Sequence, residues 1–160
     1  MILPTPLDLA YAARILEDGG DVWRERGGLR LEISSADPTP LLRFAQTTNC
    51  GYVRGPYRKL TDRPEICRCP WICECTTLEW RYTYAVYITS DVQAIIGMLW
   101  PFLLSVRIRE QWERATWPEQ RFSVMESERA RRTLASHPRR FVVRNDKRTG
   151  QRIGSTKEAA

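Results

Sequence analysis

The switching of hydrophobic periodicity along this chain is the feature that most restricts its fold. Apolar residues recur at helical spacing in some stretches and at every second position in others. The expected elements are a helix at 6–20, strands at 21–26 and 29–34, a helix at 38–48, strands at 52–59 and 79–89, and a helix at 91–104. This αββαββα order predicts an α+β fold in which helices cover one face of a four-stranded antiparallel sheet.

Turn and capping residues separate these elements. The glycine pair at 19–20 ends the first helix, and the pair at 27–28 predicts a hairpin turn. Asp37 is the expected N-cap of the second helix. A polar segment at 106–115 continues as helix, whereas the pattern beyond residue 122 is weak. The residues expected to form the apolar face of the first helix are Leu7, Ala10, Ala13 and Leu16.

Composition and charge indicate a globular domain followed by a basic tail. Hydrophobic residues make up 42% of the chain and charged residues 28%. From Glu126 onward ten Arg and Lys stand against four Asp and Glu, which accounts for the whole net charge of +6. We therefore expect a domain at 1–122 and a flexible tail at 123–160. The tail either binds a polyanion or is a solvated end.

The sequence carries no sign of export or membrane insertion. No secretory signal pattern is present, and Asp91 and Gln93 interrupt the most apolar stretch, at 85–104. We therefore expect no membrane partner and a cytoplasmic location, at the nucleoid in a bacterium.

The uncovered face of the expected sheet is rich in arginine. The candidate DNA-binding residues are Arg24, Arg26, Arg30, Glu32, Arg54, Arg58, Arg81, Thr83 and Tyr87. A solvated sheet face is always polar, so the pattern also fits a surface without a partner. Six arginines with few compensating acids are more than solvation requires, and we favour a face that contacts nucleic acid.

A cysteine-rich segment at 61–77 joins the third and fourth strands. It is symmetric about Trp71, so a hairpin tip at 70–72 brings four sulfurs together. The candidate ligands of a structural Zn²⁺ are Cys67, Cys69, Cys73 and Cys75. Zinc knuckles usually place two residues between their cysteines rather than one, and disulfides or free thiols are the alternatives.

The segment from Leu9 to Val22, which reads LAYAARILEDGGDV, resembles the motif helix of the LAGLIDADG homing endonucleases. Bacterial members of that family often read LAWAAGLFEGEGSI there. The order of the elements that follow is similar to that of the family's half-site domain. The WPFL and RIREQ stretches within 91–111 resemble its closing helices. The resemblance covers roughly residues 7–115 and includes a single copy of the motif.

The resemblance implies a protein that binds duplex DNA as a homodimer. In this family two motif helices pack side by side at a two-fold axis. A carboxylate at the end of each helix holds divalent cations such as Mg²⁺, which activate water. Each sheet lies in the major groove and reads a half-site. One motif per chain implies dimerisation and a near-palindromic target.

The motif departs from the family pattern at Arg14 and Gly19. Arg14 replaces a small glycine of the packed helix and has to leave the interface, snorkel or find a partner. Gly19 replaces the metal-binding acid in the gapless register. Either the helix end shifts so that Asp18 holds the Mg²⁺, or the chain has lost cleavage. The resemblance thus implies Asp18, Glu17 and Gln111 as candidate catalytic residues.

Three functions are compatible with these patterns. The leading hypothesis is a site-specific, Mg²⁺-dependent DNA endonuclease that acts as a homodimer. The alternative is a catalytically inactive, LAGLIDADG-derived nucleic-acid-binding protein: a repressor, an RNA maturase or a nucleoprotein subunit, for which RNA is also a partner. A third class is a zinc-stapled protein-interaction domain with no nucleic-acid role.

Overall fold

The computed structural model describes residues 3–60, 78–116, 123–136 and 142–145. The predicted α+β class is confirmed. The elements are α1 (Pro6–Gly19), β1 (Gly20–Glu25), β2 (Gly28–Ser35), α2 (Pro38–Thr48), β3 (Tyr52–Leu60), β4 (Leu78–Val86), α3 (Thr89–Leu99), the 3₁₀ helix η1 (Trp100–Phe102), α4 (Val106–Ala115), α5 (Val124–Ser136) and β5 (Val142–Asn145). Among the described residues, no helix is long and apolar enough to cross a membrane.

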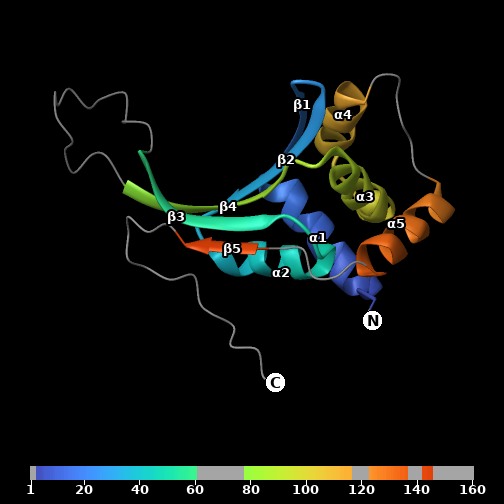
Figure 1. Cartoon of the computed structure of the whole chain (residues 1–160), viewed down its shortest axis with the longest axis horizontal. Helices are drawn as coiled ribbons and strands as arrows, with labels where there is room; N and C mark the ends of the chain where they lie inside the picture. Colours follow the sequence, from blue (N-terminus) through green and yellow to red (C-terminus); the bar gives the residue numbers. More distant parts are fainter. Residues whose placement is uncertain (1–2, 61–77, 117–122, 137–141, 146–160) are drawn as a thin grey trace.

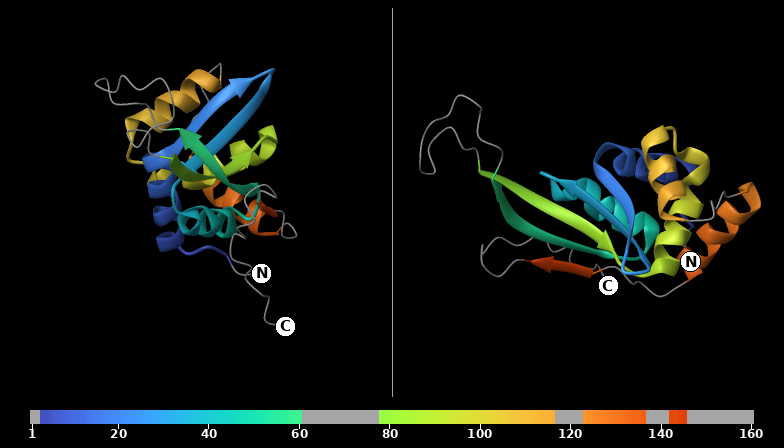
Figure 2. Two further views of the ribbon diagram at one scale, coloured as in Figure 1. Left: turned by 90° about the vertical axis from the view of Figure 1, so that its left-hand side faces the viewer. Right: turned by 90° about the horizontal axis from the view of Figure 1, so that it is seen from above.

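The strands form one sheet in the order β1-β2-β4-β3-β5 (Figure 1). The first four pair antiparallel with one another, as predicted. An additional strand, β5, joins the edge of β3 in parallel, with Tyr52 opposite Val142. Helices α1 and α2 lie against one face, and the strands bend away from them, so the other face is concave (Figures 1 and 2). We call this concave side the open face.

Helix α1 turns a different face to the core from the one expected. Thr5 and Asp8 form a capping box at its start. Its buried residues are Leu9, Ala12, Ala13 and Leu16. Leu7 and Ala10, predicted to be buried, are exposed, with Leu7 at 74%. The helical stripe is therefore shifted, and the small residues Ala12 and Ala13 pack against the chain's own core.

The observed bounds of helix α2, which packs on β4, agree closely with the predicted ones. Asp37 caps α2 by accepting a hydrogen bond from the backbone of Thr39 at 2.9 Å. Asn49 ends the helix in the left-handed conformation. The Phe44 ring packs edge-on against Tyr84 of β4, 4.8 Å between ring centroids, and both side chains are fully buried. This packing holds α2 against the middle of the sheet.

The hairpin between β1 and β2 turns one residue earlier than predicted. Its turn residues are Arg26 and Gly27, both with positive φ (48° and 82°), rather than Gly27 and Gly28. A two-residue turn of this kind requires positive φ at both positions, which is uncommon for arginine. The resulting register places Arg24 opposite the buried Leu29, on the side covered by helices.

Part of the expected tail belongs to the folded domain. Helix α5 packs along α3 and buries Leu134 and Ser127 (Figure 1). Asn49 donates a hydrogen bond to the carbonyl of Leu134 at 3.0 Å, and Arg131 donates to the carbonyl of Pro4 at 2.6 Å. The expectation of a flexible segment from residue 123 is therefore wrong for α5, whose few apolar residues give only a weak sequence pattern.

Candidate nucleic-acid interface

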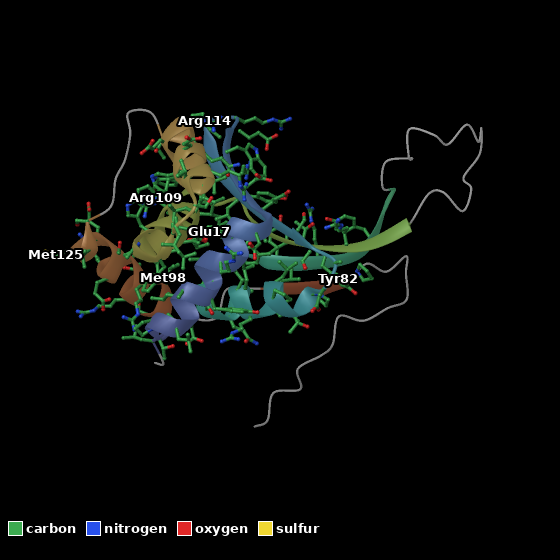
Figure 3. All side chains as sticks on the ribbon, turned by 180° about the vertical axis from the view of Figure 1, so that it is seen from behind. Glu17, Tyr82, Met98, Arg109, Arg114 and Met125 are labelled. Carbon is green, nitrogen blue, oxygen red and sulfur yellow. The ribbon has the colours of Figure 1, made fainter. Side chains whose placement is uncertain are left out.

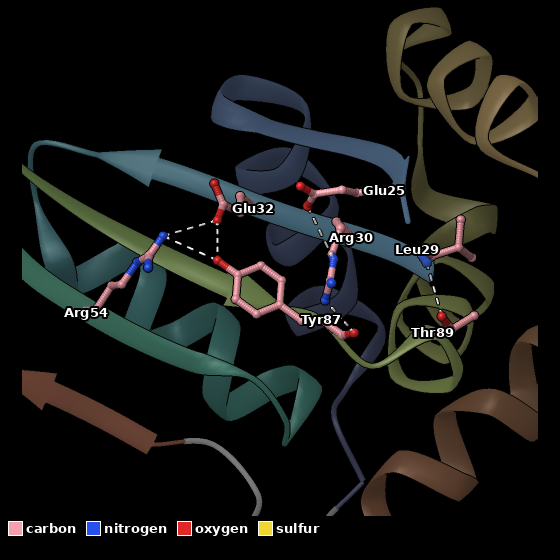
Figure 4. A network of polar contacts seen from close by, with 7 residues as sticks. All are labelled: Glu25, Leu29, Arg30, Glu32, Arg54, Tyr87 and Thr89. Atoms are coloured by element: carbon pink, nitrogen blue, oxygen red, sulfur yellow. Dashed lines mark hydrogen bonds and ion pairs between the residues drawn. The ribbon is translucent and has the colours of Figure 1, made fainter. Parts of the chain in front are cut away.

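A network of polar side chains occupies the middle of the open face (Figure 4). Glu32 projects from β2, Arg54 from β3, and Tyr87 directly follows β4. One oxygen of Glu32, Oε1, accepts a hydrogen bond from the Tyr87 hydroxyl at 2.6 Å and from Arg54 Nη2 at 3.2 Å. Arg54 Nη2 also lies 3.3 Å from the Tyr87 hydroxyl oxygen. These three side chains are the open-face cluster.

Neighbouring side chains hold Tyr87 in place from other directions. Arg30 donates to the Tyr87 carbonyl at 2.9 Å, and its guanidinium lies over the tyrosine ring, 4.8 Å from the centroid. Tyr52 packs edge-on against the same ring at 5.5 Å. Glu25 lies 3.6 Å from Arg30 Nε. The cluster is thus held in position by contacts within the chain.

Burial and hydrogen bonding keep the Tyr87 hydroxyl protonated. Desolvation is the main cause that raises the pKa of Tyr87 well above the usual value, and the hydrogen bond to Glu32 adds to it. The hydroxyl is therefore a permanent donor to Glu32 at neutral pH, which fixes the direction in which the carboxylate points.

The charge of the open face differs from the sequence expectation. Arg54 pairs with Glu32, and Arg30 pairs with Glu25, so both arginines have an acidic partner. The prediction of few compensating acids is therefore wrong for these two arginines. Paired, positioned guanidinium groups suit selective hydrogen bonding better than general attraction of phosphates.

Several predicted DNA-binding residues lie away from the open-face cluster. Arg24 points to the helix side, where its Nε donates to the carbonyl of Ala115 at 2.7 Å. Arg26 is exposed in the β1–β2 turn. Arg81 lies beyond the last residue pair of β2 with β4 and lines a cavity of about 370 Å³ beside α1.

A β-bulge explains why the predicted pattern fails along β3. The register shifts between Arg54 and Tyr57, so Tyr57 lies opposite Arg81 and Arg58 opposite Trp80. The Tyr57 hydroxyl makes a hydrogen bond with the hydroxyl of Thr83, which confirms that both residues share the open face. Tyr57 and Tyr52 are thus open-face residues that sequence reasoning missed. Counting by twos from Arg54 cannot reveal the bulge that places Tyr57 there, whereas Tyr52, two residues before Arg54, follows the regular alternation.

The acidic end of α1 has mainly structural contacts. Figure 3 shows Glu17 at the end of α1 nearest α4. Its carboxylate accepts hydrogen bonds from the backbone N–H groups of Leu104 and Ser105, just before α4 begins. Ser105, the N-cap of α4, provides no side-chain cap of its own. Glu17 therefore caps α4 across the fold, a role different from the predicted catalytic one.

Gln111, the third candidate catalytic residue, satisfies the exposed edge of β1. Its Oε1 accepts from the backbone N–H of Val22 at 3.1 Å, and its Nε2 donates to Asp21 Oδ1 at 2.9 Å. Arg107 also donates to Asp21 Oδ1 and to the carbonyls of Gly20 and Glu17 at the end of α1. Sequence reasoning missed Asp21 and Arg107, because these contacts join residues about 90 positions apart.

Asp18 remains the accessible acid at the end of α1. Its side chain is 61% exposed and forms an ion pair with Arg14 at 3.3 Å, one helical turn away. Arg14 itself projects to solvent, so it finds a partner outside the core. Asp18 and Arg14 also line the cavity beside α1. Of the three candidate catalytic side chains, Asp18 alone makes no hydrogen bond to the backbone of another described residue.

Gly19 is required by a close approach of two backbone segments. A Cβ atom built on Gly19 would lie 2.8 Å from the carbonyl oxygen of Ser34 in β2. Any side chain there, an acid included, displaces the end of α1 from β2. The close packing of α1 against β2 thus explains why this position holds glycine and not an acid.

The described residues include no group of three or more side chains arranged to hold a metal ion. The predicted zinc ligands Cys67, Cys69, Cys73 and Cys75 lie outside the described residues. Cys50 is buried, and the hydroxyl of Tyr84 donates to its carbonyl oxygen at 3.0 Å. Comparison with protein-family models, with curated proteins and with solved structures finds no match to this chain.

Proposed function

We propose that this chain binds duplex DNA site-specifically through the open face of its sheet. The observation that carries the proposal is the open-face cluster on a concave surface, with arginine and tyrosine side chains held in fixed positions. Strands of a sheet can enter the major groove, where such groups hydrogen-bond to base edges. The LAGLIDADG-like segment at 9–22 supports the same partner. Duplex RNA is a poorer candidate, since its major groove is too deep and narrow for side chains to read. This partner implies a cytoplasmic location, at the nucleoid in a bacterium.

We further propose that two copies associate through the exposed side of α1. Leu7 on this helix is 74% exposed, and Leu104, beside the other end of α1, is 86% exposed. Arg14 and Asp18 add one charge of each sign to the same helix. A two-fold interface brings a surface against itself, so exposed leucines together with one charge of each sign can be self-complementary. The expected complex is a homodimer on a near-palindromic site.

Binding and association are tested separately. Mobility-shift measurements with genomic fragments should give a specific complex that Arg54→Gln weakens, whereas Arg129→Gln, an exposed change on α5, serves as the matched control. Molecular mass by light scattering should be that of a dimer for the native chain and a monomer for Leu7→Glu. Equal losses for both arginine variants contradict binding through the open face. A monomeric native chain on and off DNA contradicts the dimer.

Metal-dependent DNA cleavage is the second candidate function. It is favoured by the exposure of Asp18 at the end of the proposed dimer helix, where two copies would bring two carboxylates together. Mg²⁺ held by Asp18 would activate water for attack on phosphate. Incubation of bound DNA with and without Mg²⁺ tests this function, and Asp18→Asn should abolish cleavage while leaving binding intact. Specific binding without cleavage by the native chain identifies the catalytically inactive alternative.

A structural Zn²⁺ at Cys67, Cys69, Cys73 and Cys75 remains a separate proposal, based on the sequence spacing. Native mass spectrometry of protein purified without chelators should find one Zn²⁺ per chain. A metal-free chain that binds DNA normally would overturn this proposal alone.

A further inference from the structure

The open-face cluster presents a hydrogen-bond acceptor and donors side by side. Within the described residues, Glu32 Oε2 has no hydrogen-bond partner, and neither do Nε and Nη1 of Arg54. Both side chains are partly accessible, at 29% and 46%. The two residues come from β2 and β3, with β4 between them. Ala85 of β4 lies opposite Glu32, and its small side chain leaves room for the carboxylate and guanidinium to meet above the sheet.

The carboxylate in this cluster argues for contact with bases rather than with the phosphate backbone. Glu32 repels a phosphate placed near Arg54 and already neutralises that arginine. A base edge, in contrast, carries both donors and acceptors. In the major groove a C·G pair offers the cytosine N4 amino group as a donor beside the guanine O6 and N7 acceptors. Carboxylates pair with the former and arginine with the latter.

We propose that Glu32 and Arg54 together read one C·G base pair in each half-site of the target. Glu32 Oε2 accepts from the cytosine amino group, and the free guanidinium N–H groups of Arg54 donate to guanine. Tyr87 is a positioning residue, because its hydroxyl holds Glu32 Oε1 and leaves Oε2 directed to the partner. This inference rests on the proposed DNA binding and adds the identity of one base pair and of its reader.

The positions of both readers are already set by the fold. Tyr87 is held by Arg30 across its ring and by Tyr52 at its edge. Little side-chain freedom is therefore lost when the base pair binds, which favours discrimination between bases. A glutamine in place of Glu32 is nearly the same size but carries an amide donor. Glutamine pairs with the N6 and N7 atoms of adenine, so it should change the preferred base instead of only weakening the complex.

The experiment is selection from a randomised duplex DNA library with the full chain, followed by sequencing. The native chain should select a C·G pair at one position of each half-site. Glu32→Gln should reduce the preference for cytosine at that position by roughly tenfold and raise that for adenine. Arg54→Gln should relax the guanine at the same pair. Glu110→Gln, an exposed change of equal charge on α4, should leave the selected sequence as in the native chain.

The possible outcomes distinguish failure of this inference from failure of the proposed DNA binding. Selection of a defined site whose base preferences are the same for the native chain and Glu32→Gln overturns the inference and leaves DNA binding standing. A preference change at an A·T pair overturns the C·G assignment. A uniform loss of affinity with unchanged preferences, in a variant that melts like the native chain, makes Glu32 structural and overturns the inference. No selected sequence for the native chain overturns both.

Discussion

Removal of the Glu17 carboxylate should destabilise the fold, because this side chain caps α4 from α1. It accepts from the backbone N–H groups of Leu104 and Ser105, and Ser105 provides no side-chain cap itself. Loss of an N-cap costs about 0.5–2 kcal/mol, and a carboxylate acceptor lies at the upper end because its hydrogen bonds are charge-assisted. We expect Glu17→Ala to lower the free energy of unfolding by about 2 kcal/mol, or Tm by about 6 °C.

Two further variants make this prediction specific. Glu17→Gln keeps a neutral acceptor and should lose about half as much stability, roughly 1 kcal/mol. Asp18→Ala removes an exposed ion pair with Arg14 one turn away and should cost no more than about 0.5 kcal/mol. Urea unfolding followed by tryptophan fluorescence gives all three values. If Glu17→Ala unfolds like the native chain yet abolishes Mg²⁺-dependent cleavage, the capping argument is refuted and the carboxylate is catalytic.

Three other predictions follow from the structure. Leu134→Ala should lower the free energy of unfolding by about 3 kcal/mol, since it leaves a cavity between α5 and α3, and an unchanged Tm would mean that α5 does not pack there. Gly19→Ala should cost about 1–3 kcal/mol because its Cβ meets the Ser34 carbonyl, and a neutral or stabilising result in thermal melts would contradict the close approach. Folding raises the pKa of Tyr84 and Tyr87 above the usual value of about 10, mainly by desolvation. The native state thus holds these protons more tightly, and stability should be full below about pH 10 and fall above it. Midpoints of urea unfolding measured from neutral pH to above pH 10 test this direction. A rise in stability above pH 10 would contradict it.

The ends and buried faces of the helices could be predicted where capping residues and apolar spacing determine them. Asp37 caps α2, Asn49 ends it, and apolar spacing identifies the core face of α3. The buried face of α1 could not be predicted in this way, because alanines lie on several sides of the helix and fit a buried face equally well. The buried face is decided by contacts with the sheet, which leave Leu7 exposed. Local sequence specifies that a helix forms more readily than which side it buries.

The candidate site was predictable only in part. Arg30, Glu32 and Arg54 were placed on the open face correctly, because each lies in a regular alternation. Arg24 was misplaced on the open face. It lies opposite Leu29, and the predicted turn at 27–28 would have paired it with Leu31, which is buried on the same side, so the hairpin places Arg24 on the helix side in either register. Contacts such as that of Glu17 with the start of α4 depend on the tertiary fold and leave no trace in local sequence.

The outer border of β1 has a consequence for how this chain can assemble. The outward N–H of Val22 is occupied by Gln111, and the carbonyl of Gly20 by Arg107, both from α4. An intruding strand finds no unpaired backbone groups at these two positions. These two contacts from α4 therefore hinder the addition of a strand from another chain along β1, a step in the growth of fibres.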